Sequence, residues 1–215
     1  MNYPIYLRLQ NRPILLVGGG SIAWQKWLGI KTFGAKVTVV ATHFNADFEN
    51  ESSEHLSKKQ RSYQASDLAG QVLVFAATND PEVNHQVVGQ ARELGIWANA
   101  VDDPPFCDFY VPAQVVQGPL QVAISSNGTS PTLTKQIKQR IQNEILTPDM
   151  AVLAELLGQF RPRVQNLITG FQNRKRFWEK VMESPVPELV KNGDARSAQL
   201  YLEFFLENRA EVVHA

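Results

Sequence analysis

The chain has 215 residues, with 21 basic and 21 acidic side chains and a single cysteine, Cys107. The balanced overall charge does not point to nucleic acids or anionic membranes as partners, and a single cysteine excludes an internal disulfide. No apolar run approaches the ~20 residues of a membrane span, and the first ten residues lack the form of a signal peptide. We therefore predict a soluble cytoplasmic protein of one large or two modest domains, with neither nucleic acid nor membrane as partner.

A glycine-rich turn follows the first apolar run. Residues 12–17 predict a buried strand, and residues 18–20 are three glycines that lead into helix-permissive residues. Gly18, Gly20 and Ala23 match the G-x-G-x-x-G/A spacing, in which small residues permit the turn, the approach of a pyrophosphate and the packing of helix on strand. A turn that binds nothing would show the same spacing. The strand before it, the helix after it and a second strand beyond favour dinucleotide binding.

The next segment completes a strand-helix-strand unit. Residues 24–33 have helical spacing and end at Gly34, and residues 36–41 form a β-branched strand. Many NAD-binding folds have an acidic residue after this second strand, where this chain has Thr42 and His43. Both can exchange hydrogen bonds with a ribose, and His43 can equally be a surface histidine. The residues alone thus do not decide between NAD and NADP.

Two further apolar strands deliver polar residues to the same edge of the predicted parallel sheet. Residues 72–77 lead to Thr78 and Asn79, and residues 96–101 lead to an acidic pair. Open α/β sheets bind ligands at the carboxyl ends of their strands, so Thr78 and Asn79 are candidate cofactor-binding residues. The turn's own geometry would explain the same residue types. In residues 45–64, which are polar, we expect only a short edge strand and little functional content.

Asp102 and Asp103 form this acidic pair at the mouth of the predicted site. A carboxylate there can act as a general base beside a hydride acceptor. Successive side chains diverge, so at most one of the two points into the cleft. The alternative is that both only begin the turn before Pro104 and Pro105. Residues 109–112 predict a further strand.

The chain then changes to a hairpin, predicted over residues 115–124, and a helix. The loop between them can cap the helix or bind an anion, and from it we predict three substrate-binding residues, Ser126, Asn127 and Thr129. An apolar stripe follows on the helix at Leu133, Ile137, Ile141 and Ile145. A narrow stripe on a helix joined to a short hairpin predicts a subunit interface.

The last third predicts a small all-helical unit, with helices around residues 150–160, 173–183 and 195–208. It is locally basic through Arg161, Arg163, Arg174, Lys175 and Arg176. A polycarboxylate ligand would favour this charge, but a solvated helix face is the simpler explanation.

Several segments in chain order carry a family resemblance. They are residues 3–5, 17–20, 76–80, 83–84, 99–102, 125–131 and 174–179. Together they resemble the precorrin-2 dehydrogenase/sirohydrochlorin ferrochelatase family, which includes the N-terminal half of multifunctional siroheme synthases. The resemblance spans nearly the whole chain, and we do not expect the methyltransferase module that is fused in some relatives.

This resemblance implies an α/β protein in three parts that forms a homodimer. The expected parts are an NAD-binding Rossmann domain over residues 1–113, a small α/β dimerisation segment over 114–146 and a helical C-terminal domain over 147–215. Family members oxidise precorrin-2 to sirohydrochlorin by passing a hydride to NAD. Some also insert ferrous iron as a substrate to make siroheme.

The resemblance also implies roles for single residues. Asp102 is the implied catalytic base in dehydrogenation and, where chelation occurs, in removing pyrrole N–H protons. Ser21, Ile22, Thr42 and His43 match nucleotide contacts, and the turn that ends at Ala23 holds the pyrophosphate. The family ends its second strand similarly, so the missing acid counts in favour of the resemblance, and the resemblance implies NAD as cofactor. We expect no resident metal, because no set of residues with ligand spacing appears.

A non-catalytic module that senses NAD is the alternative function. Such regulatory modules usually carry the acidic residue that Thr42 and His43 replace here. They also have no use for Asp102 at the mouth of the cleft.

Overall fold

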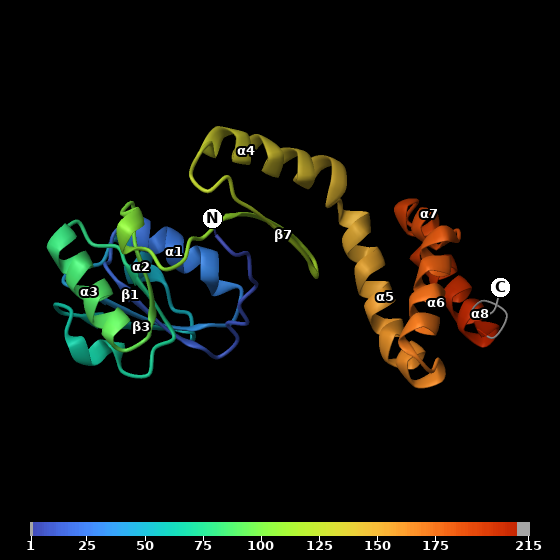
Figure 1. Ribbon diagram of the computed structural model, residues 1–215, viewed down its shortest axis with the longest axis horizontal. Helices are drawn as coiled ribbons and strands as arrows, with labels where there is room; N and C mark the ends of the chain where they lie inside the picture. Colours follow the sequence, from blue (N-terminus) through green and yellow to red (C-terminus); the bar gives the residue numbers. More distant parts are fainter. Residues whose placement is uncertain (1, 210–215) are drawn as a thin grey trace. The chain divides into compact units, whose positions relative to one another are not determined.

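A computed structural model describes residues 2–209, so residues 210–215 of the predicted helical domain lie outside the described range. The chain divides into two compact units between Val111 and Pro112. Figure 1 labels their helices and strands. The division falls close to the predicted end of the first domain at residue 113, and the predicted further boundary at residue 146 stays a prediction.

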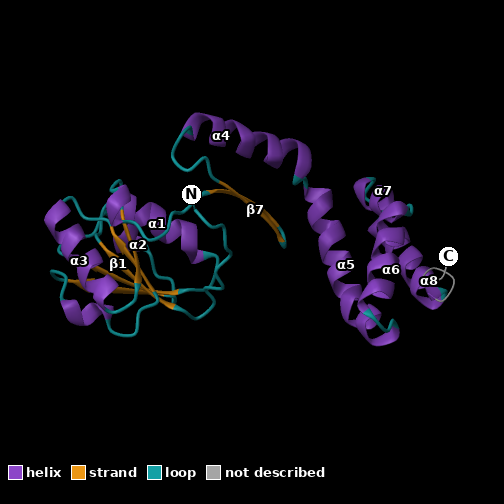
Figure 2. Cartoon of the chain, in the orientation of Figure 1, coloured by secondary structure: helices purple, strands orange, loops and turns teal. Residues whose placement is uncertain are grey.

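A five-stranded parallel sheet in the order β3-β2-β1-β4-β5 forms the first unit. Its strands are β1 Pro13–Val17, β2 Lys36–Ala41, β3 Leu56–Gln60, β4 Leu73–Ala76 and β5 Trp97–Ala100, drawn in orange in Figure 2. The order of the strands reverses where β1 and β4 lie side by side, which creates a topological switch point. This arrangement confirms the predicted α/β Rossmann fold.

Helices cover both faces of this sheet because its central strands are apolar on both sides. The helices are α1 Ser21–Lys31, α2 Ala46–Asn50 and α3 Pro81–Glu93. Ile14 and Leu16 of β1 pack in one core with residues of α1 and α2, whereas Leu15 and Val17 pack in the other core with α3. Alternation along each strand therefore builds two cores on one rigid platform.

The polar segment 45–64 contains the expected edge strand, β3, and also the short helix α2, which the sequence did not predict. Asn45 begins this helix, and its side chain accepts a hydrogen bond from the Phe48 backbone N–H at 3.0 Å. Phe48 is fully buried. One capping residue and one buried aromatic side chain are thus enough to hold a helix too short to show a periodic pattern.

The strand predicted at residues 109–112 is wrong. Side-chain contacts hold this segment instead: the Asn99 amide donates to the Phe109 carbonyl oxygen at 2.9 Å, and the Phe109 ring packs edge-to-face on Phe75 at 5.2 Å between centroids. Pro112 has no N–H and so cannot extend a ladder of hydrogen bonds. An apolar run that packs through its rings has the same pattern in sequence as a strand.

The second unit begins with the antiparallel hairpin of β6 Ala113–Gln117 and β7 Leu120–Ile124, which confirms the predicted hairpin. Helix α4, Pro131–Arg140, follows and continues as a π-helical turn over Ile141–Ile145. None of the α4 residues is buried within the described chain. The apolar stripe of this helix therefore lies at the surface.

The rest of this unit is helical, as Figure 2 shows in purple. Its helices are α5 Pro148–Leu167, α6 Phe171–Glu183, α7 Val186–Lys191 and α8 Ala195–Glu207. They share a core that contains Phe160, Phe177 and Leu202. The sequence predicted three of these four helices and missed α7, whose six residues are too few for a periodic signal. Across residues 2–209, no helix combines the length and the apolar character needed to span a membrane.

Candidate active site

A cleft of about 580 Å³ opens at the carboxyl edge of the sheet in the first unit. Its volume lies within the ~300–1,000 Å³ that is usual for small-molecule sites. The loops that follow the first four strands line it, mainly through residues 18–20, 41–43, 61–63 and 77–80. This is the edge, beside the switch point between β1 and β4, at which open α/β sheets bind ligands.

The three glycines in the first loop are present for different structural reasons. Gly18 has a φ of +127°, which favours glycine, and a Cβ atom there would collide with the Ala77 carbonyl oxygen. A Cβ on Gly19 would collide with the His43 carbonyl oxygen. A Cβ on Gly20 would meet no atom within 4 Å, and Gly20 lines the cleft. The first two glycines thus serve internal packing, and the third leaves room for a ligand.

Helix α1 begins beside this turn without a cap. Its N-cap residue is Gly20, and its first turn contains no acidic residue. Helix α3 begins at the same edge but is capped by Asp80, which accepts hydrogen bonds from the backbone N–H groups of Glu82 at 2.9 Å and Val83 at 3.4 Å. An uncapped N-terminus offers N–H groups and the positive end of a dipole to an anion. The start of α1 therefore fits the pyrophosphate of a dinucleotide.

Six of the predicted cofactor-binding residues line the cleft: Gly18, Gly20, Thr42, His43, Thr78 and Asn79. The other three, Ser21, Ile22 and Ala23, lie in the first turn of α1. Ala23 is fully buried against the sheet, where a larger side chain would push the helix away. Direct contacts of these nine residues with a nucleotide stay predictions.

Three residues that line the cleft lie at the end of the polar segment, where the sequence predicted little function. Arg61, Ser62 and Tyr63 follow β3 and line the same cleft as Thr42 and His43. Strands β2 and β3 pair in parallel, so the residues that follow them emerge at the same edge. The sequence signal that could have identified these three residues was their position directly after a predicted edge strand.

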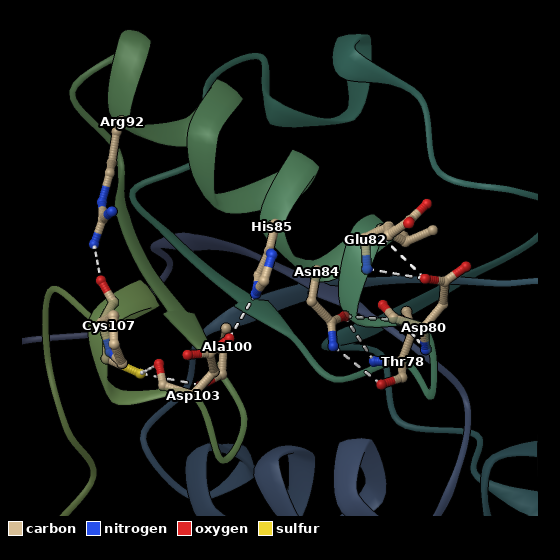
Figure 3. Close-up of polar contacts among 11 residues, drawn as sticks. Thr78, Asp80, Glu82, Asn84, His85, Arg92, Ala100, Asp103 and Cys107 are labelled. Carbon is tan, nitrogen blue, oxygen red and sulfur yellow. Dashed lines mark hydrogen bonds and ion pairs between the residues drawn. The ribbon is translucent and has the colours of Figure 1, made fainter.

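The turn after β4 is held by Asn84, as Figure 3 shows. Asn84 Oδ1 lies 3.1 Å from the Thr78 backbone nitrogen and 2.8 Å from the Thr78 hydroxyl, and the Asn84 amide donates to the Thr78 carbonyl oxygen at 3.1 Å. Asn84 is buried, so these bonds fix the turn firmly. Internal geometry thus accounts for Thr78, while the side chain of Asn79 has no hydrogen-bond partner among the described residues.

Asp102 follows β5, at the same edge of the sheet. Its neighbour Val101 donates a backbone hydrogen bond to Ala76 of β4 at 3.0 Å. The φ of Asp102 is +59°, a left-handed conformation that Asp and Asn adopt more readily than most residues. Within residues 2–209 its side chain is exposed and has no partner. Such conformations concentrate at functional sites, and a free carboxylate at a fixed position is suited to act as a base.

Asp103 has a different environment. Its Oδ2 lies 2.6 Å from Nε2 of His85 on α3, and the His85 ring stacks on Phe106 with centroids 3.8 Å apart. Figure 3 shows Asp103 directed toward His85. The two neighbouring carboxylates therefore differ: Asp103 is engaged within the protein, and Asp102 is not.

The thiol of Cys107 contacts the backbone on both sides of Asp102. Its thiol sulfur lies 3.0 Å from the Ala100 carbonyl oxygen and 3.2 Å from the Asp103 carbonyl oxygen. Burial raises the pKa of this thiol. Cys107 is thus a protonated packing group that holds the turn around Asp102.

The predicted substrate-binding residues lie in the second unit, in the loop between β7 and α4. The Thr129 hydroxyl donates to the Ser126 carbonyl oxygen at 2.7 Å, and the Ser126 hydroxyl accepts a bond from the Ser130 N–H at 3.1 Å. Asn127 has a φ of +51°. Ser126 and Thr129 therefore shape this turn, and the binding of substrate by all three residues stays a prediction.

The basic residues of the helical unit are partly engaged. Arg163 forms a bidentate pair with Glu203, with both distances at 2.7 Å, and Lys175 pairs with Glu179 at 3.5 Å. Arg174 donates to a backbone carbonyl at 3.1 Å. Two of the five basic side chains thus pair with carboxylates of the same unit, which agrees with a solvated helix face.

Three family models match consecutive parts of the chain. A model described as putative NAD(P)-binding matches residues 5–113. One described as sirohaem biosynthesis protein central matches residues 117–144, and one described as sirohaem synthase dimerisation region matches residues 150–204. Together with the glycine turn and the strand order, the first match defines an NAD(P)-binding Rossmann protein.

Curated siroheme synthases resemble nearly the whole chain. The one from Pseudoalteromonas translucida is 35% identical over 209 residues, which are 97% of this chain and 44% of that protein. The one from Nitrosospira multiformis is 37% identical over 219 residues, which cover 98% of this chain and 46% of that protein. The chain thus spans less than half the length of these relatives.

A solved structure agrees over most of the chain. SirC, precorrin-2 dehydrogenase, superposes with a TM-score of 0.73 at 27% identity and covers 94% of this chain and 99% of its own. The chain belongs to the precorrin-2 dehydrogenase/sirohydrochlorin ferrochelatase family, as its motifs predicted. These matches support an enzyme and give no support to a non-catalytic NAD-sensing module.

Proposed function

We propose that this protein oxidises precorrin-2 to sirohydrochlorin with NAD in siroheme biosynthesis. The observation that carries the proposal is the pairing, at one edge of one sheet, of an uncapped helix beside an open glycine turn with a free aspartate in a left-handed conformation. The first fits a dinucleotide, and the second fits proton transfer. The likeness to SirC supports precorrin-2 as the substrate.

The proposed chemistry divides between cofactor and protein. Oxidation removes a hydride and a proton from the macrocycle, and NAD supplies the hydride acceptor. Gly20 and the start of α1 bind the pyrophosphate, and Thr42 and His43 lie at the ribose end of the cleft. Asp102 accepts the proton. Its fixed backbone holds the carboxylate in place without a hydrogen-bond partner that would compete for the incoming proton.

Iron insertion is proposed as a second reaction of the same site. Ferrous iron is then a substrate, and Asp102 accepts the pyrrole N–H protons that the metal displaces. Among residues 2–209, no group of three or more His, Cys, Asp or Glu side chains is arranged to hold a metal ion. Ser126, Asn127 and Thr129 are proposed to bind the carboxylate arms of the tetrapyrrole, in a cytoplasmic enzyme.

Incubation of the purified protein with precorrin-2 and NAD tests the main proposal. We expect the absorbance of NADH and the absorbance of sirohydrochlorin to increase with the same time course. A second incubation with sirohydrochlorin and ferrous iron tests chelation through the spectrum of siroheme. No NADH from precorrin-2 would overturn the dehydrogenase assignment, whereas absence of siroheme alone would overturn only the second reaction.

The protein is further proposed to be a homodimer. Leu133, Ile137 and Ile145 of the stripe on α4 and the following turn are 51%, 38% and 57% exposed. The family model described as a dimerisation region matches residues 150–204, where Leu200 and Phe204 of α8 are 62% and 59% exposed. Both surfaces are too apolar to face water by preference, and each suits contact with a second copy.

Lysine at both Ile137 and Ile141 should convert the dimer to a monomer, because two charges would have to be buried in an apolar contact. Analytical ultracentrifugation at micromolar concentration measures the change. The matched control replaces Leu200 and Phe204 on α8 with lysine. If the control pair dissociates the dimer and the first pair does not, the interface lies in the helical region rather than on the predicted stripe.

A further inference from the structure

The wall of the cleft next to the end of β2 contains an arginine, Arg61, and the residues that directly follow β2 include no acidic side chain. Ala41 pairs with Gln60 across β2 and β3, so Thr42 and Arg61 leave the sheet side by side. The Gln60 amide lies 3.5 Å from the Thr42 carbonyl oxygen. Arg61 and Thr42 both line the cleft. An arginine thus stands beside the position that reads the ribose in Rossmann folds.

This position separates NAD from NADP, which differ by one phosphate on that ribose. Rossmann folds that use NAD place a carboxylate there to bind the hydroxyl, and those that use NADP place an arginine nearby to bind the phosphate. Residues 41–43 contain no carboxylate. From the residue types alone, this wall would favour NADP.

The guanidinium of Arg61 is already engaged. Its Nη1 and Nη2 donate to the two carboxylate oxygens of Asp67 at 2.8 and 2.5 Å, and Nη1 also donates to the Ser62 carbonyl oxygen at 2.9 Å. The side chain of Asp67 is only 2% exposed. Its carboxylate also accepts bonds from the Gln64 backbone N–H at 3.1 Å and from Lys59 Nζ at 3.3 Å.

Both members of this pair are ionised at neutral pH. The hydrogen bonds from Arg61 lower the pKa of Asp67 to about 2, and those to Asp67 raise the pKa of Arg61. A bidentate pair of this kind is among the strongest side-chain interactions. Drawing Arg61 toward a phosphate would leave a buried carboxylate without its main partner, which is strongly unfavourable.

We propose that Asp67 sets the choice of NAD over NADP by holding Arg61 away from the ribose phosphate. This inference rests on the proposed binding of a dinucleotide in the cleft. Other Rossmann folds obtain a preference for NAD from an acidic residue after the second strand. In this chain the preference comes from the ion pair that keeps Arg61 bound to Asp67. Asp67 is therefore a specificity-determining residue that acts through Arg61 and touches no ligand itself.

The variant Asp67→Asn tests this inference. An asparagine has the same shape and still accepts the Gln64 hydrogen bond, but it no longer holds the charge of Arg61. We expect wild-type protein to bind NAD more tightly than NADP. In the variant the affinity for NADP relative to NAD should rise about tenfold, because Arg61 can then form a charge-assisted hydrogen bond with the phosphate. Titration calorimetry with each dinucleotide at one salt concentration measures the ratio.

Two controls identify the cation. Arg61→Gln in the Asp67→Asn background should remove the gain, and Lys59→Gln in the same background should leave it. The double variant Arg61→Gln/Asp67→Asn also retains a neutral hydrogen-bonded pair, so it serves if Asp67→Asn alone does not fold. The ratio of NADP affinity to NAD affinity in this double variant should equal the ratio in wild type, because in wild type Asp67 holds Arg61 away from the phosphate. A loss of NADP affinity in the double variant would overturn the inference.

The outcomes separate this inference from the proposed function. If wild-type protein binds neither dinucleotide, the assignment of the cleft is wrong. If it binds NAD but Asp67→Asn leaves the ratio unchanged, or if wild type binds NADP as tightly as NAD, only the role of Asp67 is wrong.

Discussion

Replacing Gly20 with aspartate should abolish NAD binding and leave the fold intact. Gly20 has an extended backbone that any residue adopts, and a Cβ there meets no atom within 4 Å. Aspartate is also a favourable N-cap residue, so helix α1 should not be weakened. Its carboxylate would, however, occupy the anion site at the start of α1. Two like charges ~4 Å apart repel by about 4 kcal/mol at an effective dielectric constant of ~20, so NAD affinity should fall at least roughly 100-fold.

Titration calorimetry with NAD and a thermal unfolding curve measure the two halves of this expectation. Gly20→Ala is the matched control, because it adds a Cβ without a charge and should weaken binding less. Gly18→Ala is the opposite control: its φ of +127° and the collision with Ala77 should destabilise the fold itself. Unchanged NAD affinity in Gly20→Asp would show that the phosphates bind elsewhere.

Replacing Asp102 with asparagine should stop catalysis without loss of NAD. Positioned proton transfer typically contributes 10²–10⁴-fold to a rate, so precorrin-2 oxidation should fall by roughly 10²-fold or more. Asparagine tolerates the left-handed φ of +59° as well as aspartate does, so the turn should keep its shape. Single-turnover formation of NADH measures the chemical step, and calorimetry shows whether NAD still binds. If the protein also inserts iron, chelation by this variant should fall too.

Asp103→Asn is the matched control for this experiment. It removes the same charge one residue away and keeps an acceptor for His85, which lies 2.6 Å from Asp103. The rate should change much less than in Asp102→Asn. Near-normal oxidation by Asp102→Asn, or equal losses in the two variants, would contradict the assignment of Asp102 as the base.

The strands of the first unit were predictable because local pattern and tertiary burial agree there. Residues 14–17 and 73–76 are apolar and lie in strands that are covered on both faces, so an apolar run and a buried strand coincide. The same reasoning failed at residues 109–112, where apolar side chains pack without a ladder. It also missed α2 and α7, which tertiary contacts hold although they are too short to show a period.

The sequence by itself determined the glycine turn, the alternation of strands and helices, and the acidic pair at the end of β5, because these depend on residue type and spacing along the chain. Only the tertiary structure decided which carboxylate is free, since the distinction rests on His85, which is 18 residues from Asp103. It likewise brought Arg61 to the wall of the cleft and paired it with Asp67. A parallel sheet gathers the ends of strands that are distant in sequence at one edge, so the contacts of a site there cannot be read from neighbours in the chain.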